Sequence, residues 1–300
     1  MAEQHYDVAI VGCGIMGSAI ARRARRSGLR TIAWDRLIDR ARAVGEGVDA
    51  APELQSATGS AEVVVTMLAD AAATLSVMDA HHGFDAMKSG SAWVQMATIG
   101  LKGIIKARLV ASQRSDIVFL DAPVSGTKQP AEDGKLLILA SCDRQDVPEP
   151  VQRLFRAIGQ RTMWLGPVGQ GTRMKLVLNS WLASIMEALV ETLAVADVLD
   201  VPHERFAECI EGGPLGTPWA IAKAKKIDSG KTHETEFPLK WADKDVHLAL
   251  EAVKETAHDR ELPALEAIQK LWDRAVESNL GDRDVSAVYE ALKTPAASAR

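Results

Sequence analysis

The stretch that decides the fold of this sequence is Ile10-Val11-Gly12-Cys13-Gly14-Ile15-Met16-Gly17-Ser18. It holds a Gly-x-Gly-x-x-Gly pattern, placed directly after the apolar run that begins at Val8 and directly before Ala19-Ile20-Ala21-Arg22. The apolar run predicts a strand, the glycines a turn, and the alanine-rich segment a helix. Glycines in this context are typical of a dinucleotide-binding domain of the Rossmann type, although an ordinary loop would explain the glycines alone.

Each part of this loop has a physical reason to meet a dinucleotide. Gly12 permits the tight turn, Gly14 lacks the Cβ that would block a pyrophosphate, and Gly17 lets the helix pack close to the strand. The free backbone N–H groups at the start of the helix then bind the anion. We therefore predict that the cofactor contacts Gly12, Gly14, Ile15, Met16 and Gly17.

The composition is that of an ordinary globular protein with enough chain for two domains. Of its 300 residues 47% are hydrophobic and 25% are charged, and the formal net charge is −5. Because there is no overall positive charge, nucleic acid is not an expected partner. A basic cluster follows the glycine loop on the predicted helix, where we expect a solvated face; it consists of Arg22, Arg23, Arg25 and Arg26.

The spacing of cysteines and histidines and the pattern of apolar residues bear on metal sites, disulfides and cellular location. Cys13, Cys142 and Cys209 are odd in number and far apart, which indicates neither a disulfide framework nor a zinc site. The seven histidines show no metal-ligand spacing, so we predict no metal. Acidic residues interrupt the longest apolar stretch, 181–201, which is typical of a buried helix and not of a membrane span. Acidic residues also stand near the N-terminus, so we expect no export signal and a cytoplasmic protein.

The first half of the chain alternates between apolar, β-branched runs and helix-like segments. Strands are predicted at 8–11, 31–34, 63–68, 92–96, 117–120 and 136–140. This alternation indicates a series of βαβ units and a mainly parallel sheet.

The pattern becomes helical after the glycine-rich segment 166–171. Helices are predicted over 172–200, 203–211, 218–227, 239–257, 263–277 and 283–292, and the tail 294–300 is expected to fray. We therefore predict an α/β Rossmann-type domain for NAD(P) over 1–165. It is followed by an all-α domain over 166–300, which serves substrate binding and oligomerisation, and a long interdomain helix links the two.

The residues after the second predicted strand bear on the choice between NAD and NADP. Asp35 lies about twenty residues after the glycines, where a carboxylate can bond the adenosine ribose. Arg36 and Arg40 can pair with a 2′-phosphate, which Asp35 would repel. Two cations against one carboxylate favour NADP, and NAD remains the alternative. A solvated loop would also explain all three residues.

A second candidate loop is Asp121-Ala122-Pro123-Val124-Ser125-Gly126, which ends another predicted strand. Loops at the carboxyl ends of parallel strands lie on the binding side of such sheets. Ser125 and the backbone N–H groups that follow it could hold a substrate carboxylate. A plain turn is the alternative, since it requires the same residue types.

The third candidate is Gly169-Gln170-Gly171-Thr172-Arg173-Met174-Lys175, which leads to Asn179. Lys175 and Asn179 are one helical turn apart and share a face. An ammonium and a carboxamide together can bind and protonate a carbonyl oxygen that is becoming an alkoxide. A lone lysine on a helix is more often solvated, but an apolar helix needs a reason to carry this pair.

These motifs resemble those of the β-hydroxyacid dehydrogenase family, which includes 3-hydroxyisobutyrate dehydrogenases and glyoxylate or succinic semialdehyde reductases. Four motifs occur in the family order over nearly the whole chain: GCGIMG at 12–17, DAPVSG at 121–126, GQGTRMKLVLN at 169–179, and FPLKWADKDVHLA from Phe237. The resemblance implies that Lys175 is the general acid/base and Asn179 its companion.

The resemblance also implies roles for residues that no pattern would single out. Ser125, Gly126 and Thr127 would contact the substrate, and Thr98 the nicotinamide ribose. Further cofactor contacts would come from Met67, Leu68, Phe237 and Lys244, with Asp245 orienting Lys244. Taken alone, Asp243-Lys244-Asp245 would be a solvated charge run.

The sequence departs from the family pattern at several places. Thr127 stands where the substrate motif usually has a second glycine, which narrows the backbone approach and points to a different substrate. Leu178 replaces the first of two paired asparagines. Gln95 and Ala97 replace the usual acid and serine before Thr98, and we expect a looser loop there.

The expected function is hydride transfer between nicotinamide and a small β-hydroxyacid or its semialdehyde. Two alternatives remain: an imine reductase-like enzyme, and a non-catalytic nucleotide-binding scaffold protein. The predicted helix 172–200 has an apolar arc wider than the roughly 100° stripe of a one-sided surface helix. A homodimer or homotetramer is therefore expected besides the small-molecule substrate.

Overall fold

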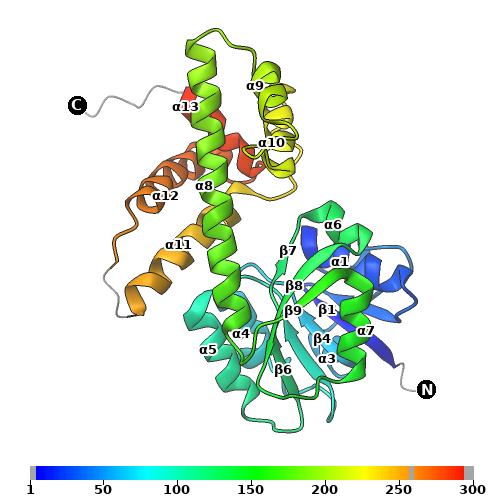
Figure 1. Ribbon diagram of the computed structural model, residues 1–300. Coiled ribbons are helices and arrows are strands. Elements are labelled where there is room, and N and C mark those ends of the chain that lie inside the picture. Colours follow the sequence, from blue (N-terminus) through cyan, green and yellow to red (C-terminus); the bar gives the residue numbers. More distant parts are fainter. Residues whose placement is uncertain (1–4, 257–259, 294–300) are drawn as a thin grey trace. The chain divides into compact units, whose positions relative to one another are not determined.

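The computed structural model describes residues 5–256 and 260–293 (Figure 1). The tail expected to fray, 294–300, lies outside these ranges. Internal contacts divide the chain into two compact units, Met1–Lys175 and Leu176–Arg300. We call them the N-terminal unit and the helical unit. The domain limits predicted at 165 and 166 remain a prediction.

The N-terminal unit is built on a nine-stranded sheet. Its order is β3-β2-β1-β4-β5-β6-β8-β7, with β9 beside β8. The strands β1 to β6 pair in parallel, while β8 runs antiparallel to β6 and β7 and parallel to β9. The mainly parallel sheet is therefore confirmed. The strands are β1 (Tyr6–Val11), β2 (Thr31–Trp34), β3 (Asp49–Ala50), β4 (Ala61–Thr66), β5 (Ala92–Gln95), β6 (Val118–Asp121), β7 (Val124–Ser125), β8 (Leu136–Cys142) and β9 (Gly159–Trp164).

Helices cover both faces of this sheet, and two separate cores result. Along β1, Val8 and Ile10 enter the core under α1, α6 and α7, whereas Ala9 and Val11 enter the core under α3 and α5 (Figure 1). This alternation explains why the strand is apolar at every position from Val8 to Val11. The helices of the unit are α1 (Ile15–Arg26), α2 (Ile38–Arg42), α3 (Leu54–Thr58), α4 (Ala71–Leu75), η1 (Ser76–Ala80), α5 (Gly100–Ala111), α6 (Lys128–Asp133) and α7 (Glu149–Ile158).

The basic cluster on α1 forms a solvated face only in part: two of its four arginines are exposed, as expected, whereas Arg22 and Arg23 are half-buried. Arg22 Nε donates to Glu132 Oε1 at 3.0 Å, and Arg26 Nη2 donates to Glu132 Oε2 at 2.7 Å. Arg23 Nε donates to the carbonyl oxygen of Ala157 at 2.8 Å. The arginine fork has several donors in fixed directions, so these side chains bind α1 to α6 and α7.

The rest of the described chain is helical, which confirms the fold class predicted from the sequence. The long helix α8 (Gln170–Val198) begins in the N-terminal unit and continues into the helical unit. The remaining elements are α9 (His203–Ile210), α10 (Pro218–Asp228), α11 (Leu239–Glu255), α12 (Pro263–Ala275), η2 (Val276–Leu280), η3 (Val285–Ala287) and α13 (Val288–Lys293). Among the helices of the described ranges, none combines the length and apolarity that a membrane crossing requires.

A buried ion pair connects α10 to η3 within the helical unit. Lys223 Nζ lies 2.8 Å and 2.9 Å from the two carboxylate oxygens of Asp284, and the two residues are 2% and 0% exposed. Ser286 Oγ also donates to Asp284 at 2.8 Å. Burial opposes ionisation of Asp284, but the charge and hydrogen bonds of Lys223 outweigh it and lower the pKa of this carboxyl.

Candidate active site

The glycine loop after β1 needs glycine for steric reasons. Gly12 has a φ of +104°, and a Cβ there would lie 2.5 Å from the carbonyl oxygen of Met67. A Cβ on Gly17 would lie 1.9 Å from the carbonyl oxygen of Gly12. By contrast, a Cβ on Gly14 would meet no described atom within 4 Å. Gly12 and Gly17 therefore shape the loop, and Gly14 keeps one side of it open.

The start of α1 has the features of an anion-binding helix terminus. Gly14 is the N-cap, and among the described residues no side chain caps this end. The first turn, which begins with Ile15 and Met16, contains no acidic residue. The backbone N–H groups of this turn therefore suit the pyrophosphate of a dinucleotide.

Asp35 ties the glycine loop to the end of β2. Its Oδ2 accepts from the backbone N–H of Cys13 at 2.9 Å, and its Oδ1 accepts from the backbone N–H of Leu37 at 3.0 Å. The residue is 9% exposed, whereas Arg36 and Arg40 beside it are exposed. The carboxylate thus has a structural task in the loop, and its contact with a ribose remains a prediction.

Cys13 occupies the middle of this loop as a buried thiol. Burial, together with the nearby Asp35 carboxylate, raises the pKa of Cys13 to about 12, although the charge of Arg40 acts in the opposite direction. The thiol contacts the carbonyl oxygen of Trp34 at 3.5 Å. The side chain is therefore a neutral, packed group at neutral pH.

The other predicted cofactor contacts of this unit follow neighbouring parallel strands. Met67 and Leu68 come directly after β4, and Thr98 comes three residues after the end of β5. All three are half-buried. Since the carboxyl ends of parallel strands meet at one edge of a sheet, these residues belong to the same edge as the glycine loop.

The loop before Thr98 is held by Gln95, so the expectation of a looser loop was wrong. Gln95 Nε2 donates to the carbonyl oxygen of Ala97 at 2.5 Å, and Gln95 Oε1 accepts from the backbone N–H of Ala97 at 3.1 Å. Gln95 is 0% exposed and also accepts from Thr66 Oγ1 at 3.3 Å. A carboxamide supplies both a donor and an acceptor, which compensates for the missing acid and serine.

The candidate substrate loop combines a short strand and a constrained glycine. Ser125 ends β7, Gly126 has a φ of +135°, and Thr127 is the N-cap of α6. A Cβ on Gly126 would lie 2.8 Å from Leu136 Cδ2. The glycine is thus required by the backbone, and the hydroxyl-bearing residues Ser125 and Thr127 flank it in the sequence.

Asp121, the first residue of the same motif, holds the beginning of α8. Asp121 Oδ2 accepts from the backbone N–H of Thr172 at 2.8 Å and of Gly169 at 3.2 Å, and Oδ1 accepts from Thr172 Oγ1 at 2.8 Å. Ser141 Oγ lies 3.2 Å from the same carboxylate. Burial raises the pKa of Asp121 to about 6, although these hydrogen bonds act in the opposite direction. The carboxylate thereby places the start of the helix that carries Lys175.

In the helical unit, one buried carboxylate joins two of the predicted residues. Asn179 Nδ2 donates to Asp245 Oδ2, and Lys244 Nζ lies 2.7 Å from Asp245 Oδ1. Asp245 is 3% exposed and Asn179 is 5% exposed. The contact between Asp245 and Lys244 agrees with the expectation that the first orients the second. Phe237, just before α11, is half-buried, and its backbone N–H donates to Asp284 at 3.3 Å.

Lys175 and Asn179 both lie on α8, one turn apart. Lys175 is the last residue of the N-terminal unit and is half-buried. Because the helix is continuous through both residues, their side chains leave the same face of α8. This is the arrangement that the sequence predicted for the acid/base pair.

Sequence reasoning missed the residues that hold the candidate site in place. Asp121 was singled out only as part of a loop, yet it binds Thr172, 51 residues further on. Asp245 was not connected with Asn179, 66 residues before it. The available signal was an acid directly at the end of a predicted strand and a second acid inside an amphipathic helix.

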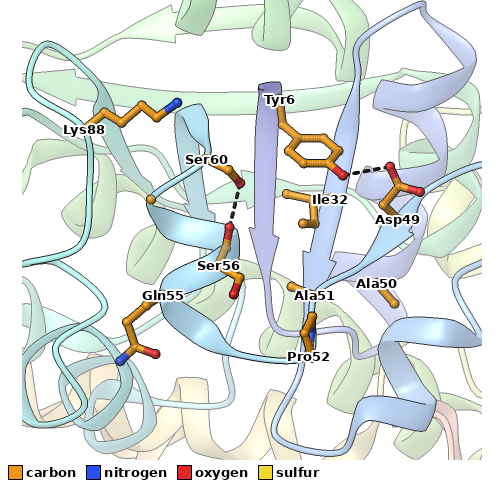
Figure 2. Close-up of a pocket in the computed structure, with 11 residues that line it drawn as sticks. Tyr6, Ile32, Asp49, Ala50, Ala51, Pro52, Gln55, Ser56, Ser60 and Lys88 are labelled. Carbon is orange, nitrogen blue, oxygen red and sulfur yellow. Dashed lines mark hydrogen bonds between the residues drawn. The ribbon is translucent and has the colours of Figure 1, made fainter. Parts of the chain in front are cut away.

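A separate cavity in the N-terminal unit does not coincide with these residues. This cavity has a volume of about 590 Å³. Figure 2 shows residues that line it, among them Tyr6, Asp49 and Lys88. Tyr6 Oη donates to Asp49 Oδ2 at 2.9 Å, and burial together with this bond raises the pKa of Tyr6 to about 12. Tyr6 begins β1, so the cavity reaches the amino end of a strand, whereas ligands of parallel sheets bind at the carboxyl ends.

Two family models together match nearly all of the chain. Residues 7–166 match the NAD binding domain of 6-phosphogluconate dehydrogenase. Residues 169–292 match the model described as NAD-binding of NADP-dependent 3-hydroxyisobutyrate dehydrogenase. The matches meet at the segment where α8 begins.

Relatives of known name are similar over the same length. Glyoxylate/succinic semialdehyde reductase 1 of Arabidopsis thaliana is 30% identical, over 96% of this chain and 98% of that protein. The cytokine-like nuclear factor N-PAC of Xenopus tropicalis is 28% identical, but the chain spans only 53% of its length. The crystal structure of 3-hydroxyisobutyrate dehydrogenase from Salmonella typhimurium has the same fold, with a TM-score of 0.82 and 23% identity over 94% of this chain and 98% of that one.

The fold and the glycine loop thus define an oxidoreductase of the class that binds a nicotinamide dinucleotide in a Rossmann-type domain. Within that class, the chain belongs to the β-hydroxyacid dehydrogenase family.

Proposed function

We propose that the chain transfers a hydride between NADP and a small β-hydroxyacid or its semialdehyde, with Lys175 as the general acid/base. The observation that carries this proposal is Lys175 on α8, one turn before an Asn179 whose amide is fixed by the buried Asp245. A scaffold protein without catalysis would have no need to keep this arrangement.

Each group of the proposed site has its own role in the reaction. The nicotinamide, when bound, supplies or accepts the hydride. Lys175 gives its proton to the carbonyl oxygen as that oxygen gains negative charge, and in the opposite direction it takes the hydroxyl proton. Asn179, whose Nδ2 donates to Asp245, lies one turn after Lys175 on the same face of α8. Ser125 and Thr127 bind the substrate carboxylate.

Replacement of Lys175 tests the mechanism. Lys175→Ala should lose about two to four orders of magnitude in kcat, which is the usual contribution of a positioned acid or base. Oxidation of reduced cofactor with semialdehydes, glyoxylate and cyclic imines is the assay. Arg173→Ala, an exposed position on the same helix, serves as the control and should keep its activity. Full turnover by Lys175→Ala would contradict the mechanism.

The cofactor preference rests on Arg36 and Arg40. Asp35 uses both carboxylate oxygens on backbone N–H groups, which weakens the argument for NAD, and the two exposed arginines remain for a 2′-phosphate. Arg36→Ala should weaken NADPH binding by about tenfold or more and leave NADH binding unchanged. Arg42→Ala, an exposed arginine paired with Asp39, is the control. Unchanged NADPH affinity in Arg36→Ala would contradict the proposal that Arg36 binds the 2′-phosphate.

A scaffold function is the second candidate, because the similarity extends to the nuclear factor N-PAC. It predicts tight binding of the reduced cofactor and no turnover with any substrate of the screen. An imine reductase-like enzyme predicts turnover with cyclic imines only. Consumption of a semialdehyde or glyoxylate by the wild type, lost in Lys175→Ala, would exclude both.

A homodimer or homotetramer in the cytoplasm completes the proposal. Large apolar side chains of α8 and the residue after it are more than half exposed in the single chain: Val177, Trp181, Val195, Val198 and Leu199. A second copy would cover them. Light scattering should give a multiple of 32.3 kDa, which Trp181→Glu should reduce. A monomeric wild type at micromolar concentration would contradict it, and cell fractionation checks the location.

A further inference from the structure

Two neighbouring helices of the helical unit bring three metal-ligating side chains together. Asp243 and His247 lie one turn apart on α11, and Asp273 lies on α12. One ligand atom from each lies within 4.8 Å of the others. His247 Nε2 is 2.8 Å from Asp273 Oδ1 and 3.8 Å from Asp243 Oδ2. Two oxygens and one nitrogen thus approach a common point.

Asp243 is the member of this cluster with an unsatisfied carboxylate oxygen. It is only 8% exposed, and its Oδ1 is buried without a hydrogen-bond partner among the described residues. A buried carboxylate oxygen with no donor is costly, because the water it has lost is not replaced. The other oxygen, Oδ2, faces His247 Nε2 at 3.8 Å, so a cation held between the two residues would compensate the charge of this poorly solvated carboxylate.

Gln269 lies beside the edge of the His247 ring, nearer to Nδ1 than to Nε2, from which Gln269 Nε2 is 3.4 Å away. Gln269 Nε2 lies 2.9 Å from His247 Nδ1, and Gln269 stands one turn before Asp273 on α12. A histidine that binds a metal through one ring nitrogen usually donates from the other to a fixed acceptor. The amide of glutamine can turn its oxygen toward that N–H, since its two ends have nearly the same shape.

We propose that Asp243, His247 and Asp273 bind a divalent transition-metal ion of the Zn²⁺ class. One imidazole and two carboxylates are ligands that Zn²⁺ accepts, whereas Mg²⁺ and Ca²⁺ prefer oxygen alone. Half-buried His247 leaves the remaining coordination position to water. The linear sequence gives no metal motif, because Asp273 follows His247 by 26 residues.

The consequence of binding would be a clamp between α11 and α12. The same α11 carries Lys244 and Asp245, and Asp245 fixes Asn179. The metal would therefore stabilise the helix that supports the candidate active site. It is assigned a structural role, because its ligands are not among the residues proposed to bind substrate or cofactor.

The test is a calorimetric titration of the metal-free, untagged protein with Zn²⁺ alone. A Cys209→Ser background removes the exposed thiol. We expect one equivalent to bind, with a rise in the thermal midpoint. His247→Ala and Asp273→Asn should each weaken Zn²⁺ binding by about a hundredfold, and Gln269→Ala by about tenfold. His82→Ala is the matched control, since exposed His82 lies 2.8 Å from Asp85 without a buried carboxylate.

Two results would overturn the proposal. One is the absence of Zn²⁺ binding by the wild type, and the other is equal affinity in the wild type and His247→Ala. Circular dichroism of the metal-free variants shows whether they fold. If His247→Ala does not, Asp273→Asn decides, because its side chain is 40% exposed and the change preserves its shape.

Discussion

Each unit of the molecule holds an aspartate that is 0% exposed, Asp121 in the N-terminal unit and Asp284 in the helical unit. Both carboxylates accept several hydrogen bonds and both hold an element in place, since Asp121 binds the start of α8 and Asp284 binds η3. Their pKa values nevertheless move in opposite directions. That of Asp121 rises to about 6, and that of Asp284 falls below its ordinary value.

The difference between the two aspartates is a cation. Burial opposes ionisation at both positions, and neutral donors act against it at both. Only Asp284 has an ammonium, from Lys223, within 3 Å. Neutral hydrogen bonds alone do not offset the desolvation of a carboxylate here, whereas a full opposite charge does.

The largest effect is expected from removing that cation. Lys223→Met should lower the free energy of unfolding by about 3–5 kcal/mol, because it leaves a buried carboxylate without its counter-ion. Urea unfolding followed by circular dichroism measures it. Lys225→Met, an exposed lysine on the same helix, should change stability by less than about 0.5 kcal/mol. Equal losses of unfolding free energy in the two variants would show that the buried ion pair stabilises the fold no more than an exposed one.

A smaller effect is expected in the pH dependence of stability that Asp121 causes, which should have the opposite sign to that of Asp284. A folded-state pKa raised from about 4 to about 6 means that the folded protein holds this proton more tightly. The resulting stabilisation is complete below about pH 4 and is lost as the pH rises through about 6, which amounts to about 2 kcal/mol between pH 4 and pH 7.

The measurement compares unfolding of the wild type and Asp121→Asn over this range. Asparagine does not titrate, so the stability of the wild type relative to the variant should decrease as the pH rises. A constant difference would show that Asp121 has the same pKa in both states. At Asp284 the sign is reversed, since a lowered pKa gives stability that is lost as the pH falls.

The smallest effect is expected for Glu132, a carboxylate that has cations beside it, as Asp284 does, but is less deeply buried. Burial opposes its ionisation, but Arg22 and Arg26 outweigh it and lower the pKa of Glu132. Glu132→Gln should cost about 1 kcal/mol at neutral pH, because the side chains are partly exposed. The loss should shrink in high salt and vanish as the pH falls through the lowered pKa. A stability loss in Glu132→Gln that does not change with salt would mean that packing, and not charge, determines the contribution of Glu132.

An element of the fold could be predicted from the sequence where residues close together in the chain determine it. The apolar strands β1, β2, β4, β5, β6 and β8 and the helices after α8 follow from periodicity in a short window. The strand β9 was missed because Gln160 and Arg161 are exposed, and its pairing is dictated by β8. The strands β3 and β7 have two residues each, which is too short for any pattern.

The candidate site divides in the same way. The glycine loop and the spacing of Lys175 and Asn179 are local, so the sequence predicts them. The contacts of Asp121 with Thr172 and of Asp245 with Asn179 join residues more than 50 positions apart. Gln95 shows the remaining difficulty: a substitution that seemed a loss provides its own hydrogen bonds once folded.

The buried thiol of Cys13 has a consequence for redox chemistry. Oxidants and alkylating reagents attack the thiolate, and a pKa of about 12 leaves almost none of it at neutral pH. The glycine loop therefore contains a thiol that resists peroxide, while the exposed Cys209 is the thiol that such reagents reach first. An oxidised preparation would show a modified surface and an unmodified nucleotide loop.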